Sequence, residues 1–119
     1  MKSKKIIIWG SAGHGSSVLD LTKNIGFKNI TFLDSDERAK KINNLELIKG
    51  EKKINQFLNK KINKQHIFTV AIGSKQKIRY NIYKQLKNKN FKLPTLIHKK
   101  SNISKTSKIK DGCHIFANT

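Results

Sequence analysis

The sequence predicts an α/β fold, in which a small Rossmann-like parallel sheet with helices on both faces is followed by the first coil of a parallel β-helix. Through residues 1–95, short apolar runs alternate with segments of helical periodicity, as in βαβ units. From residue 97 onward, isoleucine instead recurs every six residues. We therefore expect a Rossmann-like domain over residues 1–95 and the beginning of a hexapeptide-repeat β-helix over residues 96–119.

Strands are expected where β-branched and aromatic residues form short runs bounded by glycine or polar turn residues. These runs are residues 5–9, 29–33, 45–48, 65–72 and 93–97. Helices are expected where apolar residues recur at a spacing of three and four. The corresponding segments are residues 16–25, 51–60 and 75–88, with residues 37–44 as a loop. On the last helix, one apolar stripe is expected to hold Ile78, Ile82, Tyr83 and Leu86.

The loop G-S-A-G-H-G between the first strand and the first helix is the main candidate for ligand binding. Glycines let the backbone turn tightly and let a ligand come close, and the free N–H groups of a helix start attract phosphate. The glycine order differs from the usual dinucleotide pattern G-x-G-x-x-G, and a tight turn without a ligand is the alternative. The predicted contact residues of this loop are Gly10, Ala12, Gly13, His14 and Gly15.

His14 lies between two glycines of this loop. A histidine in such a position is able to hydrogen-bond a phosphate or a sugar hydroxyl, as imidazole or as imidazolium. A simple exposed loop histidine is the alternative. No second residue marks it as a catalytic base, and no catalytic residue is predicted.

Two other strand ends are expected at the same edge of the sheet, because ligands bind beyond the carboxyl ends of parallel strands. Asp34 and Asp36 follow the second strand and suit a ribose hydroxyl or a base N–H. Alternatively, aspartates in a turn accept hydrogen bonds from their own backbone. Gly73 and Ser74 end the strand at residues 65–72 and are expected to complete the floor of the crevice.

Other residues with reactive or charged side chains are expected to have structural roles. Arg79 lies on the last helix and is expected to be an ion-pair partner, with an anion contact as the alternative, and His98 follows the last expected strand. Cys113 occupies a small-residue position of the hexapeptide repeat, where packing is expected. His66 and His114 have no other histidine or cysteine at metal-ligand spacing, so no metal site is predicted.

The six-residue repeat is regular at two positions. Isoleucine recurs at residues 97, 103, 109 and 115, and the small residues Ser101, Ser107, Cys113 and Thr119 each follow four positions later. This double register favours a parallel β-helix with the aliphatic residue inward over chance alternation in an isoleucine-rich chain.

The net charge of +19 invites a nucleic-acid interpretation. The lysines are, however, spread along the whole chain, with only Arg38 and Arg79 as arginines. An ordinary basic surface is therefore expected rather than a specific nucleic-acid site. The single cysteine excludes an internal disulfide, and no apolar run is long enough for a signal peptide or a membrane span. These features predict a cytoplasmic location and no membrane span.

Taken together, the chain resembles the bacterial nucleotide-sugar acetyltransferases, which include UDP-4-amino-sugar N-acetyltransferases and sialic acid O-acetyltransferases. The resemblance rests on "IIIWGSAGHGSSVLDL", "ITFLDSD", "FTVAIGS" followed by Arg79, and "LPTLIHKKSNIS". It implies a Rossmann-like domain joined to a left-handed β-helix. It also implies a bound UDP-sugar, with Gly13, His14 and Gly15 beside the diphosphate and sugar, and Asp34 or Asp36 near the uracil.

The same resemblance implies acetyl-CoA as the acetyl donor and a homotrimer for the full-length family. In that family, the acetyl-CoA site and the general-base histidine lie on later β-helix coils between subunits. The present sequence holds four hexads and ends at Thr119. We therefore expect it to bind a UDP-sugar without having transferase activity or an acetyl-CoA site of its own.

Other functions remain as alternatives. An NAD(P)-binding redox domain uses the same fold and the same acidic residue, although the glycine order and the hexapeptide tail argue against it. A basic nucleic-acid-binding module needs cations and stacking aromatics on one face, and the sequence indicates neither. A non-enzymatic sensor or assembly partner is a further alternative.

Overall fold

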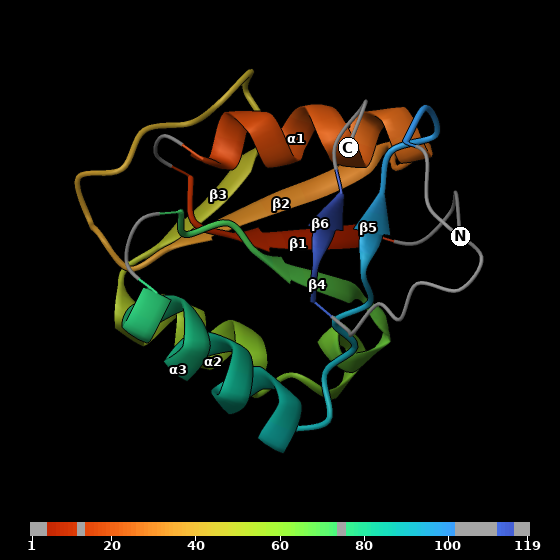
Figure 1. The fold of residues 1–119 in the computed structure, drawn as a ribbon. Helices are drawn as coiled ribbons and strands as arrows, with labels where there is room; N and C mark the ends of the chain where they lie inside the picture. Colours follow the sequence, from red (N-terminus) through yellow and green to blue (C-terminus); the bar gives the residue numbers. More distant parts are fainter. Residues whose placement is uncertain (1–4, 12–13, 74–75, 102–111, 116–119) are drawn as a thin grey trace.

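The computed structural model describes residues 5–11, 14–73, 76–101 and 112–115 (Figure 1). Within them, parallel strands form a sheet of order β3-β2-β1-β4, with bounds Lys5–Trp9 (β1), Asn29–Asp34 (β2), Glu46–Lys49 (β3) and Ile67–Val70 (β4). The helices are His14–Ile25 (α1), Glu51–Leu58 (α2), the short 3-10 helix Lys61–Gln65 (η1) and Gln76–Asn88 (α3). A separate pair of parallel strands consists of Leu96–Ile97 (β5) and His114–Ile115 (β6).

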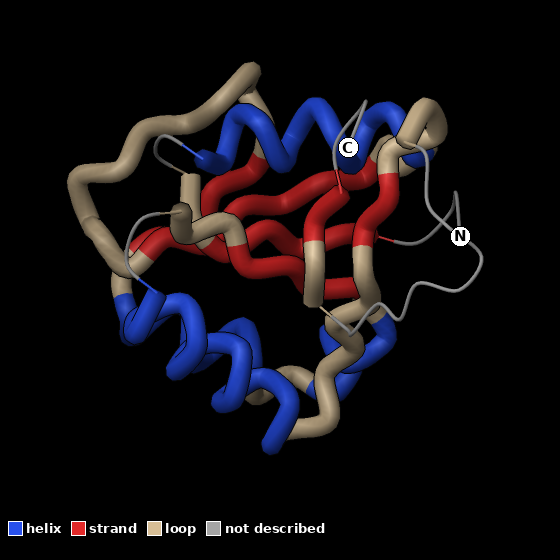
Figure 2. The backbone as a smooth tube through the Cα atoms, in the orientation of Figure 1, coloured by secondary structure: helices blue, strands red, loops and turns tan. Residues whose placement is uncertain are grey.

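Strand β1 lies inside the sheet and pairs in parallel with β2 on one side and β4 on the other. Successive side chains of a strand point to opposite faces. Ile6 and Ile8 accordingly pack in the cluster that α1 covers, whereas Ile7 and Trp9 pack in the cluster that α2 and α3 cover (Figures 1 and 2). The predicted parallel α/β fold with helices on both faces is confirmed.

Helix α1 begins two residues earlier than the sequence indicated, so that His14 and Gly15 belong to its first turn and not to the loop. The helix ends at Gly26, where φ is 118°. This conformation lets the N–H of Phe27 donate to the carbonyl of Thr22, a hydrogen bond typical of glycine-terminated helices.

The apolar stripe predicted on α3 is covered over only part of its length. Ile82 and Leu86 are buried against β4 and α2, and Tyr83 packs against the same cluster, as expected. Ile78 is instead 46% exposed. Ile78 and Ile82 border the same hollow beside Ser35, so Ile78 lies on the expected face of α3 but is open to this hollow.

Element boundaries also differ from the expectations. The strand predicted at 65–72 covers only Ile67–Val70, because Gln65 ends the 3-10 helix that the sequence did not reveal. The segment predicted at 93–97 is paired as a strand only at Leu96–Ile97. Pro94, which lacks a backbone N–H, lies inside this segment.

Strands β5 and β6 pair in the register Leu96–His114 and Ile97–Ile115. The partners are 18 residues apart, which equals three six-residue repeats and agrees with one coil of the expected β-helix. Leu96 is buried in the α1 cluster, so this pair packs directly on the Rossmann-like core. The β-helix itself and the domain boundary stay predictions, because Ile103, Ile109, Ser107 and Thr119 lie outside the described residues.

Cys113 does not pack as expected. Its side chain is exposed, and it borders an open hollow between α3 and β6. Among the described residues, no further strand lies over β6 to cover it.

Leu86→Ala tests the packing of α3 on the sheet. Leu86 is 0% exposed, and deletion of a buried leucine side chain costs about 2–5 kcal/mol. Ile78→Ala on the same helix is the matched control and should cost less than about 1 kcal/mol, since Ile78 is largely exposed. Urea unfolding measures both. Equal losses would contradict the observed orientation of α3.

Candidate functional site

The loop after β1 is shaped by Gly10, whose φ is 116°. Its N–H donates to the carbonyl of Leu33 at 2.7 Å. A methyl group at Gly10 would lie 2.7 Å from the carbonyl oxygen of Ala71, and one at Gly15 would lie 2.7 Å from the carbonyl oxygen of Gly10. Only glycine fits at either position, so the loop holds the ends of β2 and β4 and the start of α1 in close contact.

Asp34 holds the same loop from the end of β2. Its Oδ2 accepts hydrogen bonds from the backbone N–H of Ser11 at 3.1 Å and from the Ser11 hydroxyl at 2.5 Å. Its Oδ1 accepts a hydrogen bond from the backbone N–H of Asp36 at 3.0 Å. Asp34 is therefore a structural anchor for the loop, and its predicted contact with a ligand stays a prediction.

Asp36 repeats this local pattern. The backbone N–H of Arg38 donates to Asp36 Oδ1 at 2.9 Å, and this hydrogen bond lowers the pKa of the carboxyl below its ordinary value. The Arg38 side chain adds an exposed ion pair. The alternative that these aspartates bond their own backbone is thus confirmed for both, although each carboxylate has further acceptor positions.

The predicted convergence of three strand ends is confirmed for the described residues. A methyl group at Gly73 would lie 3.3 Å from Cβ of His14, so the loop after β4 touches the first turn of α1. Gly10 and Asp34 meet the same loop from β1 and β2. Three other predicted contact residues, Ala12, Gly13 and Ser74, lie outside the described residues.

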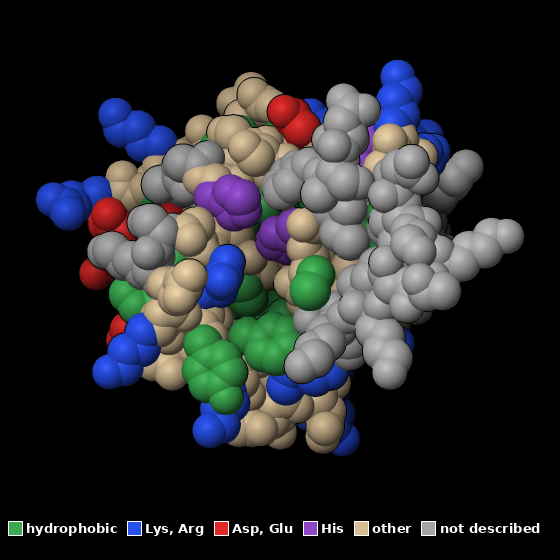
Figure 3. All heavy atoms as spheres, in the orientation of Figure 1, with side chains coloured by type: hydrophobic (Ala, Val, Ile, Leu, Met, Phe, Trp, Pro, Cys, Tyr) green, Lys and Arg blue, Asp and Glu red, His purple; other side chains and the backbone are tan. Residues whose placement is uncertain are grey.

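A hollow of about 710 Å³ opens beside this point, between α3 and β6. In the space-filling view, histidine side chains gather there beside a cationic group and hydrophobic side chains (Figure 3). The described residues that border it include no aspartate or glutamate, so the hollow favours an anionic or neutral occupant. They are His14, Val70, Gln76, Arg79, Tyr80, Tyr83, Gly112, Cys113 and His114.

His114 is the functional candidate that sequence reasoning missed. Its Nε2 forms a hydrogen bond with the hydroxyl of Thr69 on β4, and its ring stacks on that of His14 with centroids 6.0 Å apart. Burial lowers the pKa of His114 to about 4, with smaller contributions from His14 and Arg79. The six-residue repeat contained one signal for this placement, because a coil of three repeats, or 18 residues, brings His114 beside Leu96.

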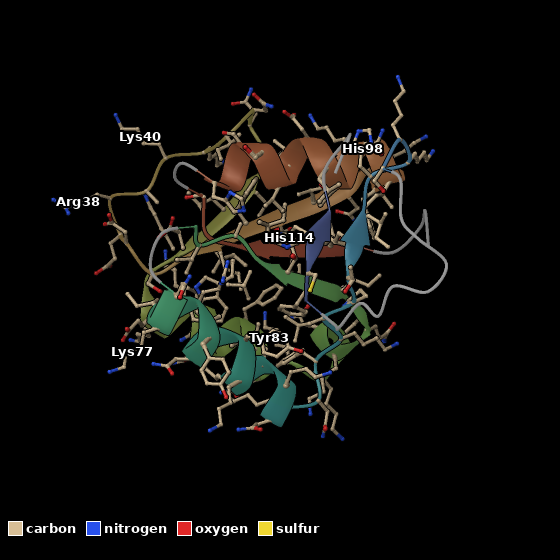
Figure 4. The ribbon with its side chains drawn as sticks, viewed as in Figure 1. Arg38, Lys40, Lys77, Tyr83, His98 and His114 are labelled. Atoms are coloured by element: carbon tan, nitrogen blue, oxygen red, sulfur yellow. The ribbon has the colours of Figure 1, made fainter. Side chains whose placement is uncertain are left out.

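Arg79 and His98 were both expected to have structural roles. Arg79 instead borders the hollow, and it forms no salt bridge among the described residues. His98 accepts a hydrogen bond at Nδ1 from the backbone N–H of Lys100, in a turn at the end of β5, as expected. In Figure 4, Arg38 and Lys40 extend away from the molecule, whereas His114 lies over the sheet.

Two smaller hollows follow the same edge of the sheet. One of about 340 Å³ is bordered by Trp9, Ser35 and the facing sides of α2 and α3. In the described part of the chain, the indole Nε1 of Trp9 is buried without a hydrogen-bond partner. The other hollow, of about 400 Å³, lies between Ser35 and the start of α2 at Gly50. Ser35 borders both, so the two hollows adjoin at this residue.

Residues 5–86 match the protein-family profile of the PglD N-terminal domain. The chain belongs to the PglD N-terminal domain family. The resemblance to nucleotide-sugar acetyltransferases is thereby confirmed, and this membership favours it over a redox domain or a nucleic-acid-binding module. No helix within the described ranges is long and apolar enough to cross a membrane.

Solved structures agree with this family. The acetyltransferase domain of PglB from Neisseria gonorrhoeae matches with a TM-score of 0.81 and 29% identity, over 97% of this chain and 54% of that one. The same domain in complex with acetyl coenzyme A matches at 0.80 and 30%, over 96% and 53%. PerB from Caulobacter crescentus, in complex with CoA and GDP-perosamine, shares the fold at 0.79 and 17% identity, over 97% and 52%. The chain spans about half the length of these structures.

Asp34→Ala tests the anchor of the glycine loop. The substitution leaves the N–H and hydroxyl of Ser11, which is buried, without their acceptor. Hydrogen bonds to a charged group contribute about 1.5–3 kcal/mol, so a loss of that size is expected in urea unfolding. Asp20→Asn, at an exposed position of α1, is the control and should change stability by less than about 0.5 kcal/mol. Unchanged stability of the Asp34 variant would contradict the anchoring role.

Stability should depend on pH through His114. The unfolded histidine binds a proton below about pH 6.5, whereas the native one stays neutral until about pH 4, so stability falls as the pH drops through this window. The loss approaches about 3 kcal/mol at 1.4 kcal/mol per pKa unit. His114→Gln lacks this titration. Urea midpoints at pH 7, 5.5 and 4.5 compare the two proteins, and His66, whose pKa burial also lowers, titrates in both. Parallel pH profiles would contradict the buried neutral state.

Proposed function

We propose that this chain is the nucleotide-sugar-binding part of a sugar acetyltransferase and that it binds a UDP-sugar at the carboxyl edge of β1, β2 and β4. The observation that carries the proposal is the meeting of three strand ends at one loop. Gly10 contacts Leu33 and Ala71, Asp34 holds Ser11, and Gly73 touches His14. Ligands of open parallel sheets bind at this edge.

The diphosphate is assigned to the glycine loop and the start of α1. His14 and Gly15 lie in the first turn of the helix, where backbone N–H groups and the helix dipole favour an anion. Gly10, Ala12, Gly13, Gly73 and Ser74 complete the proposed contacts, because residues without large side chains leave room for a ligand. The acid-free hollow beside His14 supports the placement of the sugar on that side.

The nucleoside is assigned to the other side of the loop. Asp34 and Asp36 have acceptor positions beyond their backbone hydrogen bonds, which suit a uracil N–H or ribose hydroxyls. The two adjoining hollows around Ser35 offer space at this edge.

The chemistry proposed for the complete enzyme is acetyl transfer to an amino or hydroxyl group of the bound sugar. The acetyl group comes from acetyl-CoA when that co-substrate is bound, and we assign none of the described residues to it. The residues described above bind and orient the nucleotide-sugar. Since positioning two reactants converts an intermolecular step into an effectively intramolecular one, this binding contributes directly to rate.

The location and the assembly belong to the same proposal. A nucleotide-sugar substrate and a single exposed thiol, Cys113, suit the reducing cytoplasm. We also propose that the complete enzyme is a homotrimer, as the family resemblance implies.

Calorimetric titration of the 119-residue chain with UDP tests the binding proposal, with NADH as the control ligand. UDP should bind and NADH should not. His14→Ala should weaken UDP binding about tenfold, since hydrogen bonds involving a charged group contribute about 1.5–3 kcal/mol. His98→Ala removes an imidazole far from the loop and should leave the affinity unchanged. Binding of NADH without UDP, or equal effects of the two variants, would contradict the proposal.

A further inference from the structure

The strand that carries His114 is held by contacts of the two residues that precede it, Gly112 and Cys113. The N–H of Leu96, whose side chain is buried in the core, donates to the carbonyl of Cys113 at 2.8 Å. Gly112, with a φ of 78°, lies against the ring of Tyr83, and a methyl group there would be 2.5 Å from Tyr83 Cε1. Strand β6 therefore has a defined position between β5 and α3 (Figures 1 and 4).

From this position, the imidazole of His114 lies between two residues of the Rossmann-like core. Its Nε2 forms a hydrogen bond with the hydroxyl of Thr69, which is buried in β4. Its ring lies near that of His14 with an angle of 29° between the ring planes. On another side, His14 touches Gly73. His14 thus has a ring from β6 and backbone from the loop after β4 as neighbours.

We propose that His114 is a positioning residue of the ligand site: held on Thr69, it fixes the imidazole of His14 in the direction that meets the ligand at the glycine loop. This inference rests on the proposed function, because His14 is its proposed contact with the diphosphate or sugar. It assigns to the C-terminal strands an indirect part in ligand recognition, because His114 acts through His14.

The charges around the pair suit this division of roles. The groups that face His114 are Thr69 from β4, His14 from α1, Arg79, Tyr80 and Tyr83 from α3, and Cys113 on its own segment. Among these described groups there is no carboxylate to favour a positive charge on His114, and burial lowers its pKa to about 4, which keeps the ring neutral at pH 7. A neutral His114 ring packs against His14 without adding a positive charge beside it.

A double-mutant cycle tests whether His114 acts through His14. His114→Ala and Thr69→Val should weaken UDP binding about fivefold and about twofold in titration calorimetry. In the His14→Ala background, neither substitution should have a further effect. The conservative Thr69→Val variant retains the volume of the buried side chain and removes only the hydroxyl. The same loss in both backgrounds, or no loss in either, would overturn the proposal.

Proton–carbon correlation spectra of the histidine rings give a second readout that needs no ligand. The His14 signal is assigned by its absence in His14→Ala. It should shift in His114→Ala and Thr69→Val, and it should stay unchanged in the control His98→Ala. An unmoved His14 signal in both variants overturns the proposal even if UDP binds. A shifted His14 signal in a chain that does not bind UDP supports the positioning contact and contradicts the proposed function alone.

Discussion

The turn at Gly10 is the constraint on which the rest of the structure depends. At this residue the chain leaves β1 with a backbone conformation that residues other than glycine rarely adopt, and the carbonyl oxygen of Ala71 lies 2.7 Å from where a Cβ atom would be. The N–H of Gly10 meanwhile bonds to Leu33. One residue thus joins the ends of β1, β2 and β4, and Gly15 packs the start of α1 onto it. A bulkier residue here would separate the strand ends that form the candidate site.

Asp34 extends this constraint from backbone to side chain. It ends β2, and its carboxylate reaches Ser11 in the loop after β1, so the two βα connections share one hydrogen-bonded centre. A carboxylate that already accepts three hydrogen bonds has a fixed orientation, and its remaining acceptor positions face a fixed direction. Asp34 can therefore hold the loop and also contact a ligand. The hydrogen bonds to the loop fix the direction of its remaining acceptor positions.

Sequence periodicity predicted the fold because it reports on local burial. The isoleucines of β1 and the apolar spacing of α1 reflect which faces are covered, and both elements formed as expected. Ile78 satisfied the same periodicity but is open to a hollow, and periodicity carries no information on how far along a helix its apolar face is covered. Periodicity also could not predict the hydrogen bond between Thr69 and His114, because it joins residues 45 positions apart. The topology of a parallel sheet was enough to predict that three strand ends meet. The hydrogen-bond partner of a single side chain depends on tertiary packing, which no local sequence pattern reveals.

The positive charge of the chain attracts anions in general but does not by itself recognise one particular ligand. A net charge of +19 raises the concentration of any anion near the surface, yet at physiological salt such attraction is screened within about 8 Å and does not distinguish one anion from another. Lysines on flexible stems, such as the outward Lys40, contribute to that general field (Figure 4). Discrimination requires groups held in fixed directions, and near the glycine loop these are the first turn of α1, the stacked His14 and the ring of His114 on Thr69. In the proposed site, specificity therefore depends on how closely the C-terminal strands are packed on the Rossmann-like core, and only weakly on the basic surface around it.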